Sequence, residues 1–261
     1  VFTGKLNLYR SYFFREIVDD SSITRNIAEY LFEKNHFEEA LDIFRMMLEE
    51  HPADRELLEK AGYCYQKLGN FREAIETYKK IGLSGEPTLW TLKNLGICYR
   101  KLNDYEHALE IYERASQMKP DDQTIESLIG YCHLRLGNHE TALQHYFKIE
   151  YMNPGNQHIL RPIAWCYFVM GELEKSDKYF NKVFELTPGH YDYMNYGHLQ
   201  WALGNRKKAI ELYIQSLMDR EFEMEDFLKT MEEDRPVLTG NGISNKDIPL
   251  MLDYLHYQLK K

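Results

Sequence analysis

The feature that most constrains this chain is a group of small and aromatic residues that recurs every 33 or 34 positions. The first small residues are Ala28, Gly62, Gly96, Gly130, Ala164 and Gly197. Twelve positions after each stands a second one, at Ala40, Ala74, Ala108, Ala142, Ser176 and Ala209. Four positions further on is an aromatic ring, at Phe44, Tyr78, Tyr112, Tyr146, Phe180 and Tyr213. Self-similarity at a fixed period of this length indicates a repeat architecture.

We number the first small residue as position 8 of its repeat. Each residue of the group then has a mechanical reason for its position. Small side chains at positions 8 and 20 let two helices approach closely, and the ring at position 24 fills the space beside them. Position 15 holds Asn35, Gly69, Asn103, Gly137, Gly171 and Gly204, which tolerate the left-handed conformation that ends a helix. Pro52, Pro87, Pro120, Pro154 and Pro188 close the second helices, because proline cannot continue the hydrogen-bonded ladder.

Residues 21–220 therefore resemble the tetratricopeptide-repeat family, whose period is about 34 residues. The resemblance implies an all-α fold, a right-handed α-solenoid superhelix of antiparallel helix pairs in which six repeats bury a continuous core. It also implies that the first helix of each repeat lines a concave face. In the fifth repeat, Pro162 at position 6 predicts a first helix that begins late, near Leu160, or that kinks there.

The two ends do not follow the repeat. Residues 1–20 are interpreted as an N-terminal capping helix or the remnant of an upstream repeat, and the missing initiator Met favours a longer protein. Residues 221–261 are interpreted as C-terminal capping helices, with helices expected over 223–233 and 248–259. An open repeat end would expose apolar surface, which favours caps. The alternative for the last helix is a docking or dimerising element.

Four cysteines share one slot of the repeat. Cys64, Cys98, Cys132 and Cys166 all stand at position 10, 34 residues apart. Neighbouring helices pack about 8–10 Å apart, whereas disulfide Cα atoms lie about 4.4–6.8 Å apart. We therefore expect buried, unpaired thiols, which favour a reducing, cytoplasmic location.

Motifs of catalysis and cofactor binding are absent from the sequence. It contains no phosphate-binding loop, dinucleotide fingerprint or nucleophile elbow, and the scattered histidines have no metal-ligand spacing. The longest apolar run, from 163 to 170, is too short to span a membrane. A net charge of −9 disfavours nucleic-acid binding, including an RNA-reading repeat. We expect no enzyme activity, no cofactor, no metal, no nucleic acid and no membrane insertion.

The resemblance places a partner-binding groove at positions 2, 5, 6, 9, 12 and 13 of the first helices. The predicted groove residues are Tyr63, Lys67, Lys93, Arg100, Lys101, Tyr131, Arg135, Arg161, Trp165, Phe168, His198 and Trp201. The first helices carry a net charge of +4 in a chain of −9, which predicts an acidic segment as the ligand. Lys93, Arg100, Lys101 and Arg135 are its expected charge partners, unless they are ordinary solvated charges.

Aromatic rings at positions 9 and 12 distinguish the last two repeats. We expect Trp165 and Phe168 to be exposed for binding, and Trp201 to pack against the C-terminal helices. The family's clamp for chaperone tails needs Asn at position 9, and no repeat has it here. The predicted function is a protein-interaction scaffold that binds an extended, acidic peptide segment. The alternative is a self-associating or regulatory domain of a longer protein.

Overall fold

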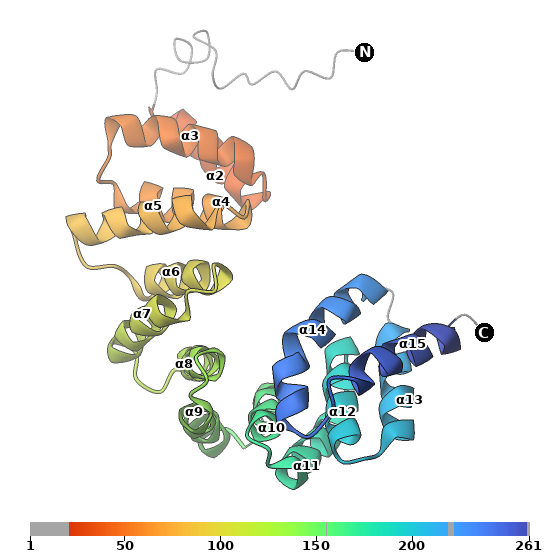
Figure 1. Ribbon diagram of the computed structural model, residues 1–261. Coiled ribbons are helices and arrows are strands. Elements are labelled where there is room, and N and C mark those ends of the chain that lie inside the picture. Colours follow the sequence, from red (N-terminus) through yellow and green to blue (C-terminus); the bar gives the residue numbers. More distant parts are fainter. Residues whose placement is uncertain (1–20, 155, 219–221, 260–261) are drawn as a thin grey trace, which may run out of the picture. The chain divides into compact units, whose positions relative to one another are not determined.

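A computed structural model describes residues 21–154, 156–218 and 222–259, and the predicted N-terminal helix lies outside these residues. Their secondary structure is helical throughout (Figure 1). Six helix pairs follow one another: α2 (Ser21–Glu33) with α3 (Phe37–Glu50), α4 (Arg55–Lys67) with α5 (Phe71–Ser84), α6 (Leu89–Lys101) with α7 (Tyr105–Met118), α8 (Gln123–Arg135) with α9 (His139–Met152), α10 (Leu160–Val169) with α11 (Leu173–Phe184), and α12 (His190–Ala202) with α13 (Arg206–Leu217). Two further helices, α14 (Met224–Gly240) and α15 (Asp247–Leu259), complete the described chain.

The chain divides into two compact parts, and the division falls within α8. The N-terminal part ends at Ile125, and the C-terminal part begins at Glu126. The architecture in both is an α-solenoid, in which consecutive antiparallel helices stack on one another. The aromatic rings at position 24 are fully buried in all six helix pairs. Each pair therefore contributes one ring to the core at the point where its two helices come closest.

The predicted left-handed residues between paired helices are confirmed at all six positions. Asn35 and Asn103 have φ values of 61° and 60°, and the glycines at the other four positions have φ values between 77° and 83°. Asn is the residue other than Gly that enters this conformation most readily. These residues reverse the chain into the second helix of each pair.

The fifth repeat is irregular at the predicted place. A short 3-10 helix, η2 (Gln157–Ile159), precedes α10, which begins at Leu160. Pro162 thus lies in the first turn of α10, where backbone N–H groups have no carbonyl partner within the helix, so the proline costs no hydrogen bond. Ser176, which replaces alanine at position 20, is fully buried, and its hydroxyl donates to the Ala164 carbonyl at 2.8 Å. That bond satisfies the hydroxyl where the two helices approach most closely.

The helix expected over 223–233 is longer than predicted. It continues as α14 through Pro236 to Gly240, and it ends at the polar stretch. Proline removes one hydrogen bond of the helical ladder. The Thr239 hydroxyl, close to the proline, donates to the Arg235 carbonyl at 3.1 Å. The last predicted helix is present as α15.

Candidate functional site

A row of aromatic side chains crosses the first-helix face of the N-terminal part. This aromatic strip consists of Phe32, Tyr63 and Trp90 from the first helices, together with Phe37 at the start of the second helix α3. The Phe32 ring centroid lies 5.5 Å from that of Tyr63, and the Tyr63 centroid lies 5.6 Å from that of Trp90. Trp90 is 43% exposed, and the other three rings are half-buried. The strip thus presents a continuous aromatic surface that solvent reaches.

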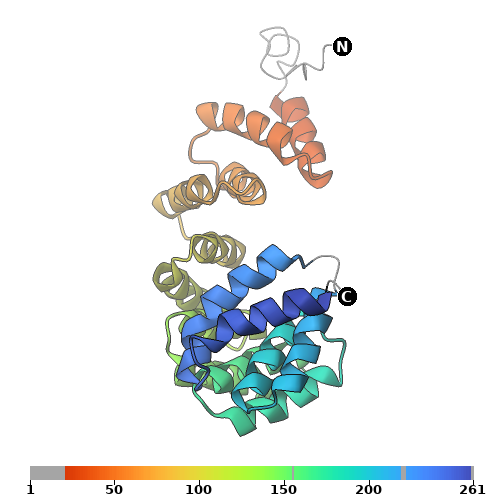
Figure 2. The same cartoon turned by 45° about the vertical axis from the view of Figure 1, so that its right-hand side comes forward.

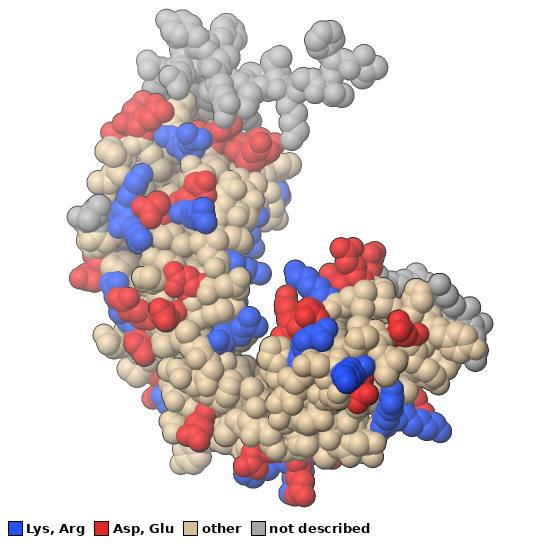
Figure 3. Space-filling model, in the orientation of Figure 1, with Lys and Arg blue, Asp and Glu red and all other residues tan. Residues whose placement is uncertain are grey.

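Lysine side chains stand beside this strip. The Lys67 ammonium lies 5.1 Å from the Tyr63 ring centroid, within the range of a cation–π contact. Lys101 holds the same position 13 in the next repeat, and both lysines are exposed. Figure 3 shows Lys and Arg side chains along the margin of this part beside α4 and α6. Of the predicted groove residues, Tyr63 and Lys67 thus contact each other, and Lys101 is exposed at the equivalent position of the next repeat.

Lys93 and Arg100 are placed differently from these two lysines. The Lys93 ammonium lies 3.9 Å from a carboxylate oxygen of Asp122, which also contacts Lys119 at 3.0 Å. The pKa of Asp122 is lowered, because the contact with Lys119 and a backbone hydrogen bond outweigh the burial that would raise it. Arg100 is half-buried. Part of the positive charge predicted for ligand binding is thus balanced within the chain.

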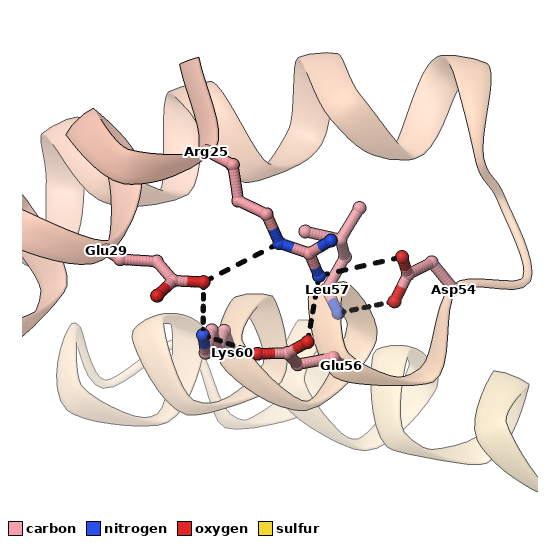
Figure 4. A network of polar contacts seen from close by, with 6 residues as sticks. All are labelled: Arg25, Glu29, Asp54, Glu56, Leu57 and Lys60. Atoms are coloured by element: carbon pink, nitrogen blue, oxygen red, sulfur yellow. Dashed lines mark hydrogen bonds and ion pairs between the residues drawn. The ribbon is translucent and has the colours of Figure 1, made fainter. Parts of the chain in front are cut away.

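Ion pairs link the first two repeats on the same face (Figure 4). The Lys60 ammonium contacts Glu29 at 2.7 Å and Glu56 at 2.8 Å, and Arg25 contacts Glu56 at 2.9 Å. The hydrogen bond from Lys60 lowers the pKa of Glu56. Burial would lower the pKa of Lys60, but the hydrogen bonds that its ammonium donates to Glu29 and Glu56 raise it.

This network was missed in the sequence, although its residues stand at positions 2, 5, 6 and 9. The signal available in the sequence was that oppositely charged residues occupy these positions in the first two repeats, which predicts ion pairs between them. Glu29 occupies position 9 of the first repeat, where the chaperone-tail clamp has Asn. The cations at this end of the face already have carboxylate partners.

In the C-terminal part, helix α14 covers the first-helix face of the last two repeats. Both Figure 1 and Figure 2 show α14 beside α10 and α12. The Asn241 side-chain amide, just after α14, donates to the Phe168 carbonyl at 3.0 Å. The Phe227 ring of α14 packs edge-on against Tyr213 with centroids 5.6 Å apart. Phe168, Trp201, Phe227 and Leu238 belong to one buried cluster.

The expectation that Phe168 is exposed for binding is therefore wrong. Phe168 and His198 are 0% exposed and Trp201 is 8% exposed, because α14 and its neighbours lie over them. For Trp201, packing against the C-terminal segment is confirmed. Trp165 is half-buried at the edge of the cluster, with its ring centroid 5.4 Å from that of Phe168. Sequence position alone did not reveal this cover.

The remaining predicted residues of the C-terminal part fall into two groups. Arg161 donates through Nε to both carboxylate oxygens of Asp192 at 2.8 Å, so its charge has a partner inside the fold. Tyr131 is half-buried and Arg135 is exposed on α8. Their role in binding stays a prediction.

A buried carboxylate lies between α8 and α9. Glu126, which is 3% exposed, accepts from Lys148 at 2.7 Å and contacts the His145 Nδ1 at 2.8 Å. Burial would raise the pKa of Glu126, but these two contacts outweigh it and lower the pKa. The arrangement fastens the two helices of the fourth repeat together.

The four cysteines are buried thiols, as their common repeat position predicted, and none forms a disulfide. Burial raises the pKa values of Cys64, Cys98 and Cys166 to about 12. A thiol is nucleophilic only as the thiolate, so these groups are unreactive at neutral pH. Over residues 21–154, 156–218 and 222–259, no group of three His, Cys, Asp or Glu side chains could hold a metal ion. Among the same residues, no helix is long and apolar enough to cross a membrane.

Comparison with protein families identifies the repeat. Three family models described as tetratricopeptide repeat match residues 31–95, residues 90–122, and residues 163–190 together with 193–218. Together these ranges cover more than half of the chain. No curated protein matches the sequence.

Solved structures share the fold at low sequence identity. The MamA protein is 24% identical with a TM-score of 0.58, over 63% of this chain and 90% of MamA. A tetratricopeptide repeat protein from Parabacteroides merdae is 17% identical with a TM-score of 0.56, over 90% of this chain and 98% of its own. PilF of Pseudomonas aeruginosa is 17% identical with a TM-score of 0.60, over 81% of this chain and 96% of its own. At these identities the likeness concerns the fold alone.

Proposed function

The chain belongs to the tetratricopeptide-repeat family, and we propose that it is a non-catalytic scaffold that binds an extended, acidic protein segment on the first-helix face of its N-terminal part. The observation that carries this proposal is the aromatic strip with Lys67 against its Tyr63 ring. Grouped, solvent-reached aromatic rings favour a binding surface, because they bury large apolar area at little cost in side-chain entropy.

The charges near the strip favour an acidic ligand. Arg25 and Lys60 have carboxylate partners, and Lys93 shares Asp122 with Lys119. Lys67 is exposed against the Tyr63 ring, and Lys101 is exposed at the same position of the next repeat, so a ligand carboxylate reaches both. Opposite charge steers the encounter and fixes the register of the ligand more than it sets the affinity.

Site-specific photocrosslinking tests the proposal. The full chain carries a benzophenone amino acid in place of Tyr63, and Tyr151 receives the same replacement as the control. Tyr151 is 88% exposed and lies on α9, a second helix of the C-terminal part. After irradiation in extracts of the source cells, we expect protein adducts at position 63 but not at position 151. The crosslinked segment should be rich in Asp and Glu.

Two other results would count against this scaffold. Equal adducts at both positions would show that the strip has no preference for a partner. Adducts consisting only of a second copy of the chain would favour the alternative, a self-associating domain.

A further inference from the structure

The surface under α14 has the composition of a binding site rather than of a repeat interface. The aromatic rings Trp165, Phe168 and Trp201 stand at positions 9 and 12 of the last two repeats, where a partner would bind. A segment from outside the repeats covers them, and it does so as a helix. We propose that the first-helix face of α10 and α12 is a second binding site, selective for an amphipathic helix that carries one carboxylate in its apolar stripe, and that α14 occupies it until a partner helix replaces it.

The side of α14 that meets this face has the spacing of a helical ligand. Phe227, Met231, Asp234 and Leu238 stand at i, i+4, i+7 and i+11, which places them in one stripe. The three apolar members are 0–1% exposed. Asp234 is the one acid in the stripe, and its Oδ2 lies 3.3 Å from the His198 Nε2. The site thus accepts three apolar anchors and one carboxylate.

The outward side of α14 is acidic. Glu225, Asp226, Glu232 and Glu233 are exposed. Glu225 and Asp226 also lie in the first turn, where negative charge stabilises the helix N-terminus. These exposed acids do not meet the site, so the feature that a competing partner must share is the apolar stripe containing one acid.

Two details show that α14 fills the site imperfectly. The His198 Nε2 is buried and makes no hydrogen bond, although the Asp234 Oδ2 lies 3.3 Å from it. The His198 Nδ1 is engaged with the Tyr213 hydroxyl at 2.7 Å, so only Nε2 is directed to the occupant. In addition, Pro236 interrupts the ladder of α14. A partner helix without proline that offers a carboxylate to the His198 Nε2 would bind without either of these two defects.

Competition by a synthetic peptide tests this proposal on the full chain. The probe is a fluorescent peptide of residues 223–241 that carries Pro236→Ala. One host is the unaltered chain, and the second carries Phe227→Ala and Met231→Ala, which weaken its own α14. We expect the probe to bind the second host at least tenfold more tightly. A third host with Tyr254→Ala, an exposed ring on α15, should match the unaltered chain.

Controls in the peptide identify the anchors. A peptide with Phe227→Ala and Met231→Ala should lose at least tenfold in affinity for the second host, and Asp234→Asn should lose affinity only while His198 is present. The same Kd for all three hosts, or no binding to a folded second host, would overturn the proposal.

Hydrogen exchange of the unaltered chain keeps the test decisive if the second host fails to fold. Displacement requires α14 to open while α12 stays folded, so the amides of 224–240 should exchange at least tenfold faster than those of 190–202. Adding the probe in excess should increase the exchange of α14 further. Equal, slow exchange in both helices would show that α14 opens only with global unfolding, and would refute displacement.

Discussion

A β-carbon placed on Gly62 would lie 2.7 Å from Cε1 of Tyr78, so the glycine is required by the ring that packs on it. The same close approach joins position 8 to position 24 at Gly96, Gly130 and Gly197, and across all six repeats the residue pairs vary together. The Ala–Phe pairs are Ala28–Phe44 and Ala164–Phe180, and the Gly–Tyr pairs are Gly62–Tyr78, Gly96–Tyr112, Gly130–Tyr146 and Gly197–Tyr213. Alanine thus occurs where the ring lacks a hydroxyl.

We expect Gly62→Ala to destabilise the protein by about 1–3 kcal/mol, because the added methyl overpacks a buried contact. Adding Tyr78→Phe should recover part of the loss, since the smaller ring reproduces the Ala–Phe pair. Gly82→Ala is the control, because a β-carbon there meets no atom within 4 Å in an exposed stretch of helix. That change should stabilise by at most about 1 kcal/mol. Urea denaturation followed by circular dichroism measures all three.

Trp90→Ala should reduce the affinity for the segment recovered by crosslinking about 30-fold, because an aromatic anchor at an interface contributes about 2 kcal/mol or more. Tyr151→Ala removes a more exposed ring and should leave the affinity unchanged. Isothermal titration calorimetry gives both values. An unchanged affinity for Trp90→Ala would remove the aromatic strip as the binding surface.

Alkaline pH should destabilise the protein through its buried thiols. Burial raises the pKa of Cys64, Cys98 and Cys166 from 9.0 to about 12. Unfolded thiols lose their protons first, so this contribution is complete below about pH 9 and is lost as the pH rises towards about 12. Replacing the three cysteines by alanine should flatten the decline in the free energy of unfolding over this range. If the variant and the unaltered protein show the same slope, other groups, such as the buried tyrosines, cause the decline.

Glu126 should make the free energy of unfolding decrease at acidic pH. Its pKa is lowered in the folded state, so its contribution is present above the ordinary value of 4.5 and is lost as the pH falls through the folded value. Lys148→Met removes one partner and should cost about 1–3 kcal/mol at pH 7, and less at low pH. Lys79→Met, which removes an exposed contact with Glu76 and a cation–π contact with Tyr99, should cost at most about 1 kcal/mol. Thermal denaturation at a series of pH values compares the two variants.

The fold could be read from the sequence because the contacts that define a repeat lie within or next to it. Gly62 meets Tyr78 sixteen positions later, and the left-handed residue between the paired helices is a local property of Asn or Gly. Each such contact recurs with the period, so six copies reinforce one interpretation. The cysteines were assigned correctly for the same reason, because one recurring slot has one environment.

The candidate site could be predicted only in part. Tyr63 and Lys67 were identified from their positions, but Phe32, Phe37 and Trp90 were overlooked, because a strip depends on rings from different helices coming together. The ion pairs of Arg25 and Lys60 were missed in the same way.

The helix pairs, their turns, and the burial of the rings and thiols could be predicted because they follow from residue spacing within one period. Which first-helix face is open depends instead on packing between segments far apart in the chain. Asn241 reaches Phe168 across 73 positions that no periodicity connects, and α14 turns an expected binding surface into a buried one. The physical reason is that exposure depends on which segment packs over a face, whereas the face's own residues only make such packing favourable.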